Sequence, residues 1–164
     1  MMISSVKALL TLTLTLVGLA NACATAEREL QVADVSAKML EAVNRKRTEK
    51  GLVAVCINEK LMRAAQVLAD DMAQNNFVDT TGSDGSKLAD RAAAQSMNVS
   101  ASAEVVAAGY SSAERVVALW SEDSDSFIYS DLPFVGPGYK YDASKRYKHY
   151  WVLDFAVAED EVCA

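Results

Sequence analysis

The chain has few basic residues for its length. Its 164 residues include 16 lysines and arginines against 22 aspartates and glutamates, so the formal net charge is −6. We expect the densest basic cluster at Arg45, Lys46 and Arg47, where Glu41 and Glu49 are close in sequence. Nucleic acids and anionic membrane surfaces attract basic proteins, so we expect neither of them to be a main partner.

Histidine is scarcer still, since the chain has a single one, His149. Histidine is the side chain that most readily exchanges a proton near neutral pH, and hydrolytic mechanisms commonly depend on it. A zinc site needs several deprotonated ligands that converge. No Ser-His-Asp set can be assembled around His149 from the sequence. We therefore predict no catalytic residue, no metal and no cofactor, with a protease or other hydrolase as the less favoured alternative.

The chain also lacks an apolar run long enough to span a membrane. Residues 8–20 (ALLTLTLTLVGLA) form an apolar run of only 13 residues, and a transmembrane helix needs about 20. Lys7 precedes the run, and small residues follow it, with A-x-A sites that end at Ala22, Ala24 or Ala26. This arrangement predicts a cleaved signal peptide over residues 1–24 and a secreted protein. The alternatives are an N-terminal membrane anchor and a lipoprotein anchor at Cys23.

Only three cysteines are present, at positions 23, 56 and 163. Cleavage after Ala24 or Ala26 removes Cys23 and leaves an even pair. In an oxidising compartment we expect Cys56 and Cys163 to form a disulfide, and the alternative is two buried thiols. Asn98-Val99-Ser100 is an N-glycosylation sequon, which matters in a secreted eukaryotic chain.

Helical patterns come first along the chain and strand patterns come last. Helical spacing of apolar residues begins near Val35, with Asp34 or Ser36 as the cap, and Gly51 is expected to stop this helix. After a capping box at Ser111-x-x-Glu114 and a serine-rich acidic loop, the last third alternates in the manner of a hairpin. The roughly 140 residues left after cleavage suit one domain of the α+β class. The other predicted elements are a helix over 59–72, a loop over 80–86, a short helix over 87–95, a short strand near 105–107, and strands over 135–141 and 147–157.

Seven short motifs follow one another along the chain. They are MLEAVNRKR (39–47), Gly51-Leu52 with Leu61 and Ala64-Ala65, DMA (71–73) with Phe77, TGSDG (81–85) with Arg91, AEVVAAG (103–109), Val116-Val117 with Trp120, and GxGY (136–139) with YWVxDF (150–155). In this order they resemble the CAP superfamily of cysteine-rich secretory proteins, antigen 5 and plant pathogenesis-related proteins of group 1. The resemblance covers residues 35–157, nearly all of the mature chain, and it implies that residues 33–164 form a CAP or SCP-like domain. It also implies a three-layer α-β-α sandwich with a central antiparallel sheet.

CAP domains carry a cleft with two histidines and two acidic residues, where some members bind a divalent metal. Position by position, the resemblance places Thr80 where the first histidine stands and keeps the first acidic residue as Glu104. Glu122 or Asp123 matches the second acidic position, and Ser126 is the nearest match to the second histidine. Both histidines are therefore replaced, and carboxylates alone would favour a weakly held hard cation over zinc.

The resemblance implies a secreted, non-catalytic CAP domain that binds a small lipid, such as a sterol or fatty acid, or an extracellular partner protein. The alternative is a secreted effector or interaction protein with a vestigial cleft. Glu104 also has a purely structural interpretation, in which its carboxylate bonds to backbone amides or to a neighbouring helix. For His149 the structural interpretation is a half-buried residue of the last strand.

Overall fold

The computed structural model describes residues 33–164. The predicted signal peptide, its cleavage sites and Cys23 lie outside these residues. The first described element is a helix over residues 33–49, and eight further helices and strands follow it. They are β1 (Cys56–Ile57), α2 (Glu59–Asn75), α3 (Leu88–Ala94), β2 (Ala101–Ala108), α4 (Ala113–Trp120), the 3-10 helix η1 (Phe127–Tyr129), β3 (Phe134–Tyr141) and β4 (His149–Val157).

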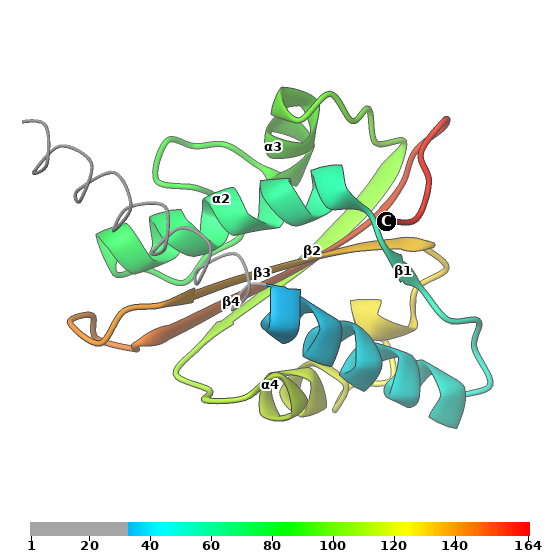
Figure 1. Ribbon diagram of the computed structural model, residues 1–164, viewed down its shortest axis with the longest axis horizontal. Helices are drawn as coiled ribbons and strands as arrows, with labels where there is room; N and C mark the ends of the chain where they lie inside the picture. The colour runs from blue at the N-terminus through cyan, green and yellow to red at the C-terminus, as the bar shows by residue number, and fades with distance from the viewer. Residues whose placement is uncertain (1–32) are drawn as a thin grey trace, which may run out of the picture. The chain divides into compact units, whose positions relative to one another are not determined.

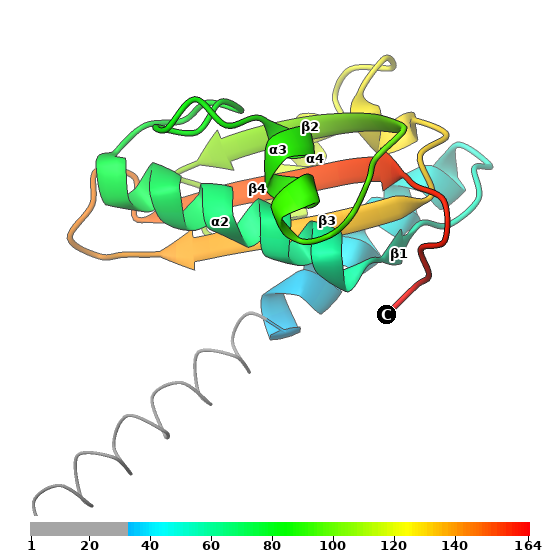
Figure 2. The same cartoon turned by 90° about the horizontal axis from the view of Figure 1, so that it is seen from above.

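The strands form one sheet in the order β1-β3-β4-β2. The three long strands pair in antiparallel fashion, and the two-residue strand β1 adds to β3 in parallel. Figures 1 and 2 show α2 and α3 on one face of this sheet, and the helix of residues 33–49 with α4 on the other. The predicted three-layer α-β-α sandwich is therefore confirmed.

Strand β4 runs through the centre of the sheet, and its side chains alternate between the two layers. Trp151, Leu153 and Phe155 pack with the first helix and α4. Tyr150 and Val152 pack instead against α2. Every residue from Tyr150 to Ala156 is buried, which explains why this stretch is almost entirely apolar.

Helix α2 lies unusually close to strand β3 because two glycines face it. A Cβ atom at Gly136 would stand 2.3 Å from the backbone carbon of Leu61, and one at Gly138 would stand 2.5 Å from that of Ala65. Any larger residue would push the helix off the sheet. The GxGY motif therefore sets the distance between the central layer and α2.

Two helix starts differ from the expected ones. Residues 33 and 34 are already helical, so neither Asp34 nor Ser36 caps the first helix. The cap of α4 is Ser112, one residue after the expected Ser111, and its hydroxyl accepts a hydrogen bond from the Arg115 backbone N–H. Both errors have the same cause: neighbouring serines and aspartates offer equivalent cap chemistry, and tertiary packing selects among them.

The C-terminal tail returns to the start of α2. Cys163 forms a disulfide with Cys56, as predicted, across 107 residues of sequence. The Glu161 carboxylate accepts hydrogen bonds from Lys60 and from Asn58, the N-cap of α2, at 2.6 and 2.9 Å. None of the helices within residues 33–164 is long and apolar enough to cross a membrane.

Candidate functional site

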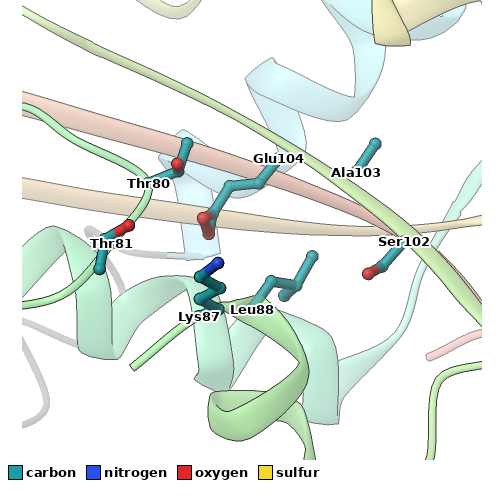
Figure 3. Close-up of a pocket in the computed structure, with 7 residues that line it drawn as sticks. All are labelled: Thr80, Thr81, Lys87, Leu88, Ser102, Ala103 and Glu104. Carbon is teal, nitrogen blue, oxygen red and sulfur yellow. The ribbon is translucent and has the colours of Figure 1, made fainter. Parts of the chain in front are cut away.

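A polar pocket opens where the loop after α2 meets the start of α3 and strand β2 (Figure 3). Its volume is about 240 Å³. The side chains of Lys87 and Glu104 point toward one another across it, and Thr80 and Thr81 stand at one side. The pocket is lined by Thr80, Thr81, Lys87, Leu88, Ser102, Ala103 and Glu104. Two of these, Thr80 and Glu104, are residues that the sequence predicted for a cleft.

The Glu104 carboxylate is bound by a buried arginine. Nη2 of Arg91, in α3, lies 2.5 and 2.8 Å from the two carboxylate oxygens of Glu104, in β2. The two side chains are only 3% and 5% exposed. A charge-assisted contact of this length away from water is among the stronger hydrogen bonds that a protein forms. Glu104 is thus tied to the helix above it, as its structural interpretation expects.

The same arginine also holds the loop that closes the pocket. Its Nη1 donates to the carbonyl of Ser86 at 2.9 Å, and its Nη2 approaches the carbonyl of Thr80 at 3.4 Å. The loop is fixed a second time by Asp71 of α2, whose carboxylate accepts from the backbone N–H and the hydroxyl of Ser83. These hydrogen bonds lower the pKa of Asp71 although burial opposes them. The pocket wall is therefore built from the loop after α2, the start of α3 and strand β2.

A third ionisable side chain, Asp154 of β4, lies beside the Arg91–Glu104 ion pair. It lies directly opposite Glu104 in the pairing of β2 with β4, and it is fully buried. Neither of its oxygens has a donor from which to accept a hydrogen bond. Burial raises the pKa of Asp154 well above its ordinary value, and the Glu104 carboxylate raises it further. Both effects favour the neutral form of Asp154, beside the ion pair of Arg91 with Glu104.

This arrangement differs from the family cleft in the side chains that it presents. A general base or a metal ligand needs a lone pair that is free to act. Both oxygens of Glu104 already accept from Arg91, and a hydroxyl at Thr80 replaces an imidazole. Within residues 33–164, no group of three or more His, Cys, Asp or Glu residues is placed to hold a metal ion. The divalent metal known for some family members does not fit the side chains present here.

The remaining predicted cleft residues lie in the turn after α4 and do not line this pocket. Glu122 and Asp123 are exposed, and the Asp123 carboxylate accepts from the Asp125 backbone N–H at 3.0 Å. Ser126 is half-buried and caps η1 by accepting from the Ile128 N–H, while its hydroxyl donates to the Trp120 carbonyl. Of the five candidates, the structure thus brings only Thr80 and Glu104 together at one pocket. Ser126 instead stabilises the start of η1.

His149 lies away from the pocket, at the start of β4. Its Nδ1 is 2.8 Å from the hydroxyl of Tyr139, and its ring centroid is 4.9 Å from that of Tyr141. Partial burial lowers its pKa, and the charge of Lys148 lowers it further. This agrees with the predicted half-buried strand residue. Asn98 is exposed in the turn before β2, so its sequon is accessible, and glycosylation there stays a prediction.

Arg91 and Asp154 were not predicted as site residues, although both stand within motifs of the family resemblance. One signal was available for Asp154: it is the only charged residue in the apolar run from Tyr150 to Val157. A buried strand seldom carries a carboxyl group without a specific neighbour. For Arg91 the sequence offered no comparable signal, because arginines at the ends of short helices are usually solvated.

The chain matches the model of the CAP family, the cysteine-rich secretory protein family, over residues 40–155. The match covers well over half of its length, and the chain therefore belongs to this family. A search among curated proteins gives no match. The resemblance that the motifs predicted is confirmed.

Solved structures with the same fold come from three bacteria. An outer surface protein of Borrelia burgdorferi superposes with a TM-score of 0.66 at 18% identity, over 77% of this chain and 94% of that one. An extracellular SCP-domain protein of Bacillus anthracis gives 0.61 at 17%, and a cysteine-rich secretory protein of Staphylococcus aureus gives 0.54 at 20%. Each of these two matches covers 72% of this chain, which spans only 38% and 36% of their respective lengths. At these identities the likeness establishes the fold alone.

Proposed function

We propose that this chain is a secreted, non-catalytic CAP domain that acts by binding an extracellular partner. One observation carries the non-catalytic part: the acidic residue retained from the family cleft, Glu104, is held in a buried ion pair with Arg91. A carboxylate that neutralises a buried arginine cannot leave it to take up a proton or a metal without leaving that arginine charged and unpaired. The cleft residue therefore serves the fold.

Three observations support an extracellular location. The family is that of cysteine-rich secretory proteins, and the three structural neighbours are described as outer surface, extracellular and secretory proteins. The Cys56–Cys163 disulfide is the kind of bond that persists in oxidising compartments. The apolar run at the N-terminus has the form of a secretory signal.

A partner bound at the surface suits the described pocket better than a lipid does. Pockets that enclose drug-sized ligands usually exceed about 300 Å³ and are mostly apolar. The pocket at Glu104 has a volume of about 240 Å³ and carries two threonines, a serine, a lysine and a carboxylate. Binding of a sterol or fatty acid between the helices is the alternative, which a lipid-uptake assay tests.

The non-catalytic role is tested with the chain produced through a secretory host, so that its disulfide forms. It is screened against a peptide library and a panel of small esters. We expect no turnover above background. Turnover that is lost in Thr80→Ala or Lys87→Ala would overturn the proposal, because these pocket residues do not contribute side chains to the Arg91–Glu104 pair. An unchanged melting temperature in both variants would show that the loss is chemical.

The same preparation is tested with radiolabelled cholesterol and palmitate at micromolar concentration. We expect no saturable uptake of either lipid. Saturable uptake at a ratio near one lipid per chain would show that a lipid, and not a macromolecule, is the ligand of this domain.

A further inference from the structure

The two edges of the sheet differ in how well they are covered. Strand β1 has only two residues, and the C-terminal tail lies along it, because the Ala164 N–H donates to the Ile57 carbonyl at 2.8 Å. Strand β2 has eight residues and forms the opposite edge, on the outer side of the sheet in Figure 2. An uncovered edge strand offers its main-chain N–H and carbonyl groups to any chain that extends beside it.

The pairing of β2 with β4 shows which of its main-chain groups face outwards. The Gly109 N–H donates to the His149 carbonyl at 2.9 Å, at one end of a register that runs without a break along β2. In an antiparallel pair, alternate residues bond to the partner strand, so the even-numbered residues of β2 turn their N–H and carbonyl groups away from β4. These residues are Ser102, Glu104, Val106 and Ala108.

Most of these outward groups are open to a further strand. Within residues 33–164, the Val106 carbonyl alone among them has a hydrogen-bond partner, the indole N–H of Trp120 at 3.3 Å. The Glu104 side chain is only 5% exposed, yet the residue as a whole is half-buried, so solvent reaches its main chain. Ser102 is exposed. The outward groups of Ser102 and Glu104 and the N–H of Val106 are therefore free to bond to another chain.

The pocket at Glu104 lies beside this free stretch of β2. Ser102, Ala103 and Glu104 form one of its walls. The Glu104 side chain points to the α3 side of the sheet, where it meets Arg91, and Ser102, two residues before it, points the same way. Side chains directly opposite each other in an antiparallel pair lie on the same face. A chain bound antiparallel along Ser102 and Glu104 therefore directs every second side chain into the pocket.

The uncommitted side chains of the pocket can all donate hydrogen bonds. Lys87 is exposed, and its ammonium group forms no ion pair with any residue in the described part of the chain. Thr80, Thr81 and Ser102 each bring a hydroxyl to the pocket (Figure 3). The one acid in the lining, Glu104, is already paired with Arg91. The pocket is therefore suited to a side chain that carries acceptor oxygens and a negative charge.

Three acidic residues close in sequence do not alter this preference, because none of them lines the pocket. Each accepts a hydrogen bond from a main-chain N–H of its own turn, at 2.7 to 2.9 Å. All three are exposed, so water and salt screen their charges. They are Asp79, Asp84 and Asp90.

We propose that the free edge of β2 binds an extended peptide segment of another protein as an additional antiparallel strand, with an aspartate or glutamate of that segment in the pocket at Lys87. Main-chain hydrogen bonds to Ser102 and Glu104 supply affinity, and the side chain that enters the pocket supplies specificity. The carboxylate accepts from the Lys87 ammonium and from the neighbouring hydroxyls. This proposal rests on the proposed function, because it names the chemistry of the partner that the domain binds.

A second copy of this chain suits the edge less well than such a peptide. If two β2 strands paired with each other, the only acidic side chain that either could bring is Glu104. That carboxylate is held by Arg91 of its own chain, with side chains that are 5% and 3% exposed. It cannot enter the pocket of the other copy without leaving a buried arginine unpaired.

The test uses the secreted chain and immobilised heptapeptide pools in which only the central residue is fixed, with one pool for each amino acid. We expect the Asp and Glu pools to bind best. The Gln pool should bind about tenfold more weakly, because it lacks the charge that pairs with Lys87. A Glu pool that is N-methylated at the central residue should not bind, since that N–H faces β2. N-methylation of the next residue, whose N–H faces away, is the control and should leave the affinity unchanged.

Two variants of the chain test the same contacts from the protein side. Lys87→Gln should weaken binding of the Glu pool about tenfold. The matched control Lys46→Gln, in the first helix on the other face of the sheet, should leave it unchanged. Ser102→Pro removes an outward N–H and no bond to β4, so it should abolish binding with little change in melting temperature.

The proposal is overturned if no pool binds, if the Gln pool binds as tightly as the Glu pool, or if N-methylation of the central residue has no effect. It is also overturned if Lys46→Gln loses as much affinity as Lys87→Gln. A dimer in gel filtration that Ser102→Pro dissociates would show that a second copy occupies the edge instead. Failure here with no turnover in the enzyme screen would reject the peptide and leave the non-catalytic role intact.

Discussion

Glu104 and Asp154 face each other across strands β2 and β4, and only Glu104 has a cationic partner within hydrogen-bond distance. Arg91 binds the Glu104 carboxylate at 2.5 and 2.8 Å, whereas Asp154 is fully buried with no donor on either oxygen. One cation can balance only one of two adjacent carboxylates in a dry interior. Burial next to Glu104 therefore raises the pKa of Asp154 and favours its neutral form.

This relationship predicts how Asp154→Asn changes stability with pH. The folded-state pKa of Asp154 is raised, so the folded chain keeps a proton that the unfolded chain releases above about pH 3.8. The wild type consequently loses stability as pH rises through the range between the two pKa values, by at most about 1.4 kcal/mol per pH unit. Asparagine does not titrate, and it keeps the size and shape of the carboxyl group.

We therefore expect Asp154→Asn to match the wild type at pH 3 and to exceed it at pH 7, measured by urea unfolding. Asp142→Asn is the control of opposite sign, because hydrogen bonds from Ser144 lower the pKa of that exposed carboxylate. It should be no more stable than the wild type at pH 7. A stability difference for Asp154→Asn that is the same at both pH values would show that the residue does not titrate as described.

A second prediction concerns the contact between α2 and β3. Gly136→Ala places a methyl group 2.3 Å from the backbone carbon of Leu61, and the helix backbone cannot move aside as a side chain could. We expect a loss of about 3 kcal/mol in the free energy of unfolding, at the upper end of the usual cost of overpacking. In Gly51→Ala the new methyl group meets no atom within 4 Å, and the only strain comes from the positive φ of that residue. This variant should therefore lower the free energy of unfolding by about 1 kcal/mol. Equal losses in the two variants would contradict the close approach of helix and strand.

A third prediction concerns the disulfide. The bond closes a loop with a sequence separation of 107 residues, so the double variant Cys56→Ser/Cys163→Ser should lose about 4 to 5 kcal/mol if chain entropy dominates. Lys60→Gln removes only a partly exposed ion pair with Glu161 in the same tail and should cost no more than about 1 kcal/mol. Thermal melting with and without reductant measures both effects. Melting that reductant does not change would show that the bond contributes nothing to stability.

The main helix and the last strand were predicted well because their patterns come from packing, whereas the three layers were implied by the family resemblance alone. The apolar spacing from Leu61 to Met72 gives a helix with all its predicted core positions buried, and the alternation after Tyr147 gives a central strand. The exact helix starts failed, since adjacent Ser111 and Ser112 are chemically equivalent as caps.

The site was less predictable because its key contacts are between residues distant in sequence. Thr80 and Glu104 were expected together and do line one pocket. The partner that decides the state of Glu104 is Arg91, and that of Asp154 is Glu104 itself. Each of these pairings depends on strand register and on where α3 lies over the sheet, neither of which a local pattern specifies.

The central claim is that the retained acidic residue of the cleft stabilises the fold and performs no chemistry. The most direct test is the urea unfolding of Glu104→Gln at pH 7, beside the matched variant Glu122→Gln. Removing the counter-charge of buried Arg91 should lower the free energy of unfolding by at least about 3 kcal/mol. The exposed Glu122 variant should change it by less than about 0.5 kcal/mol. A Glu104→Gln chain as stable as the wild type would contradict the account.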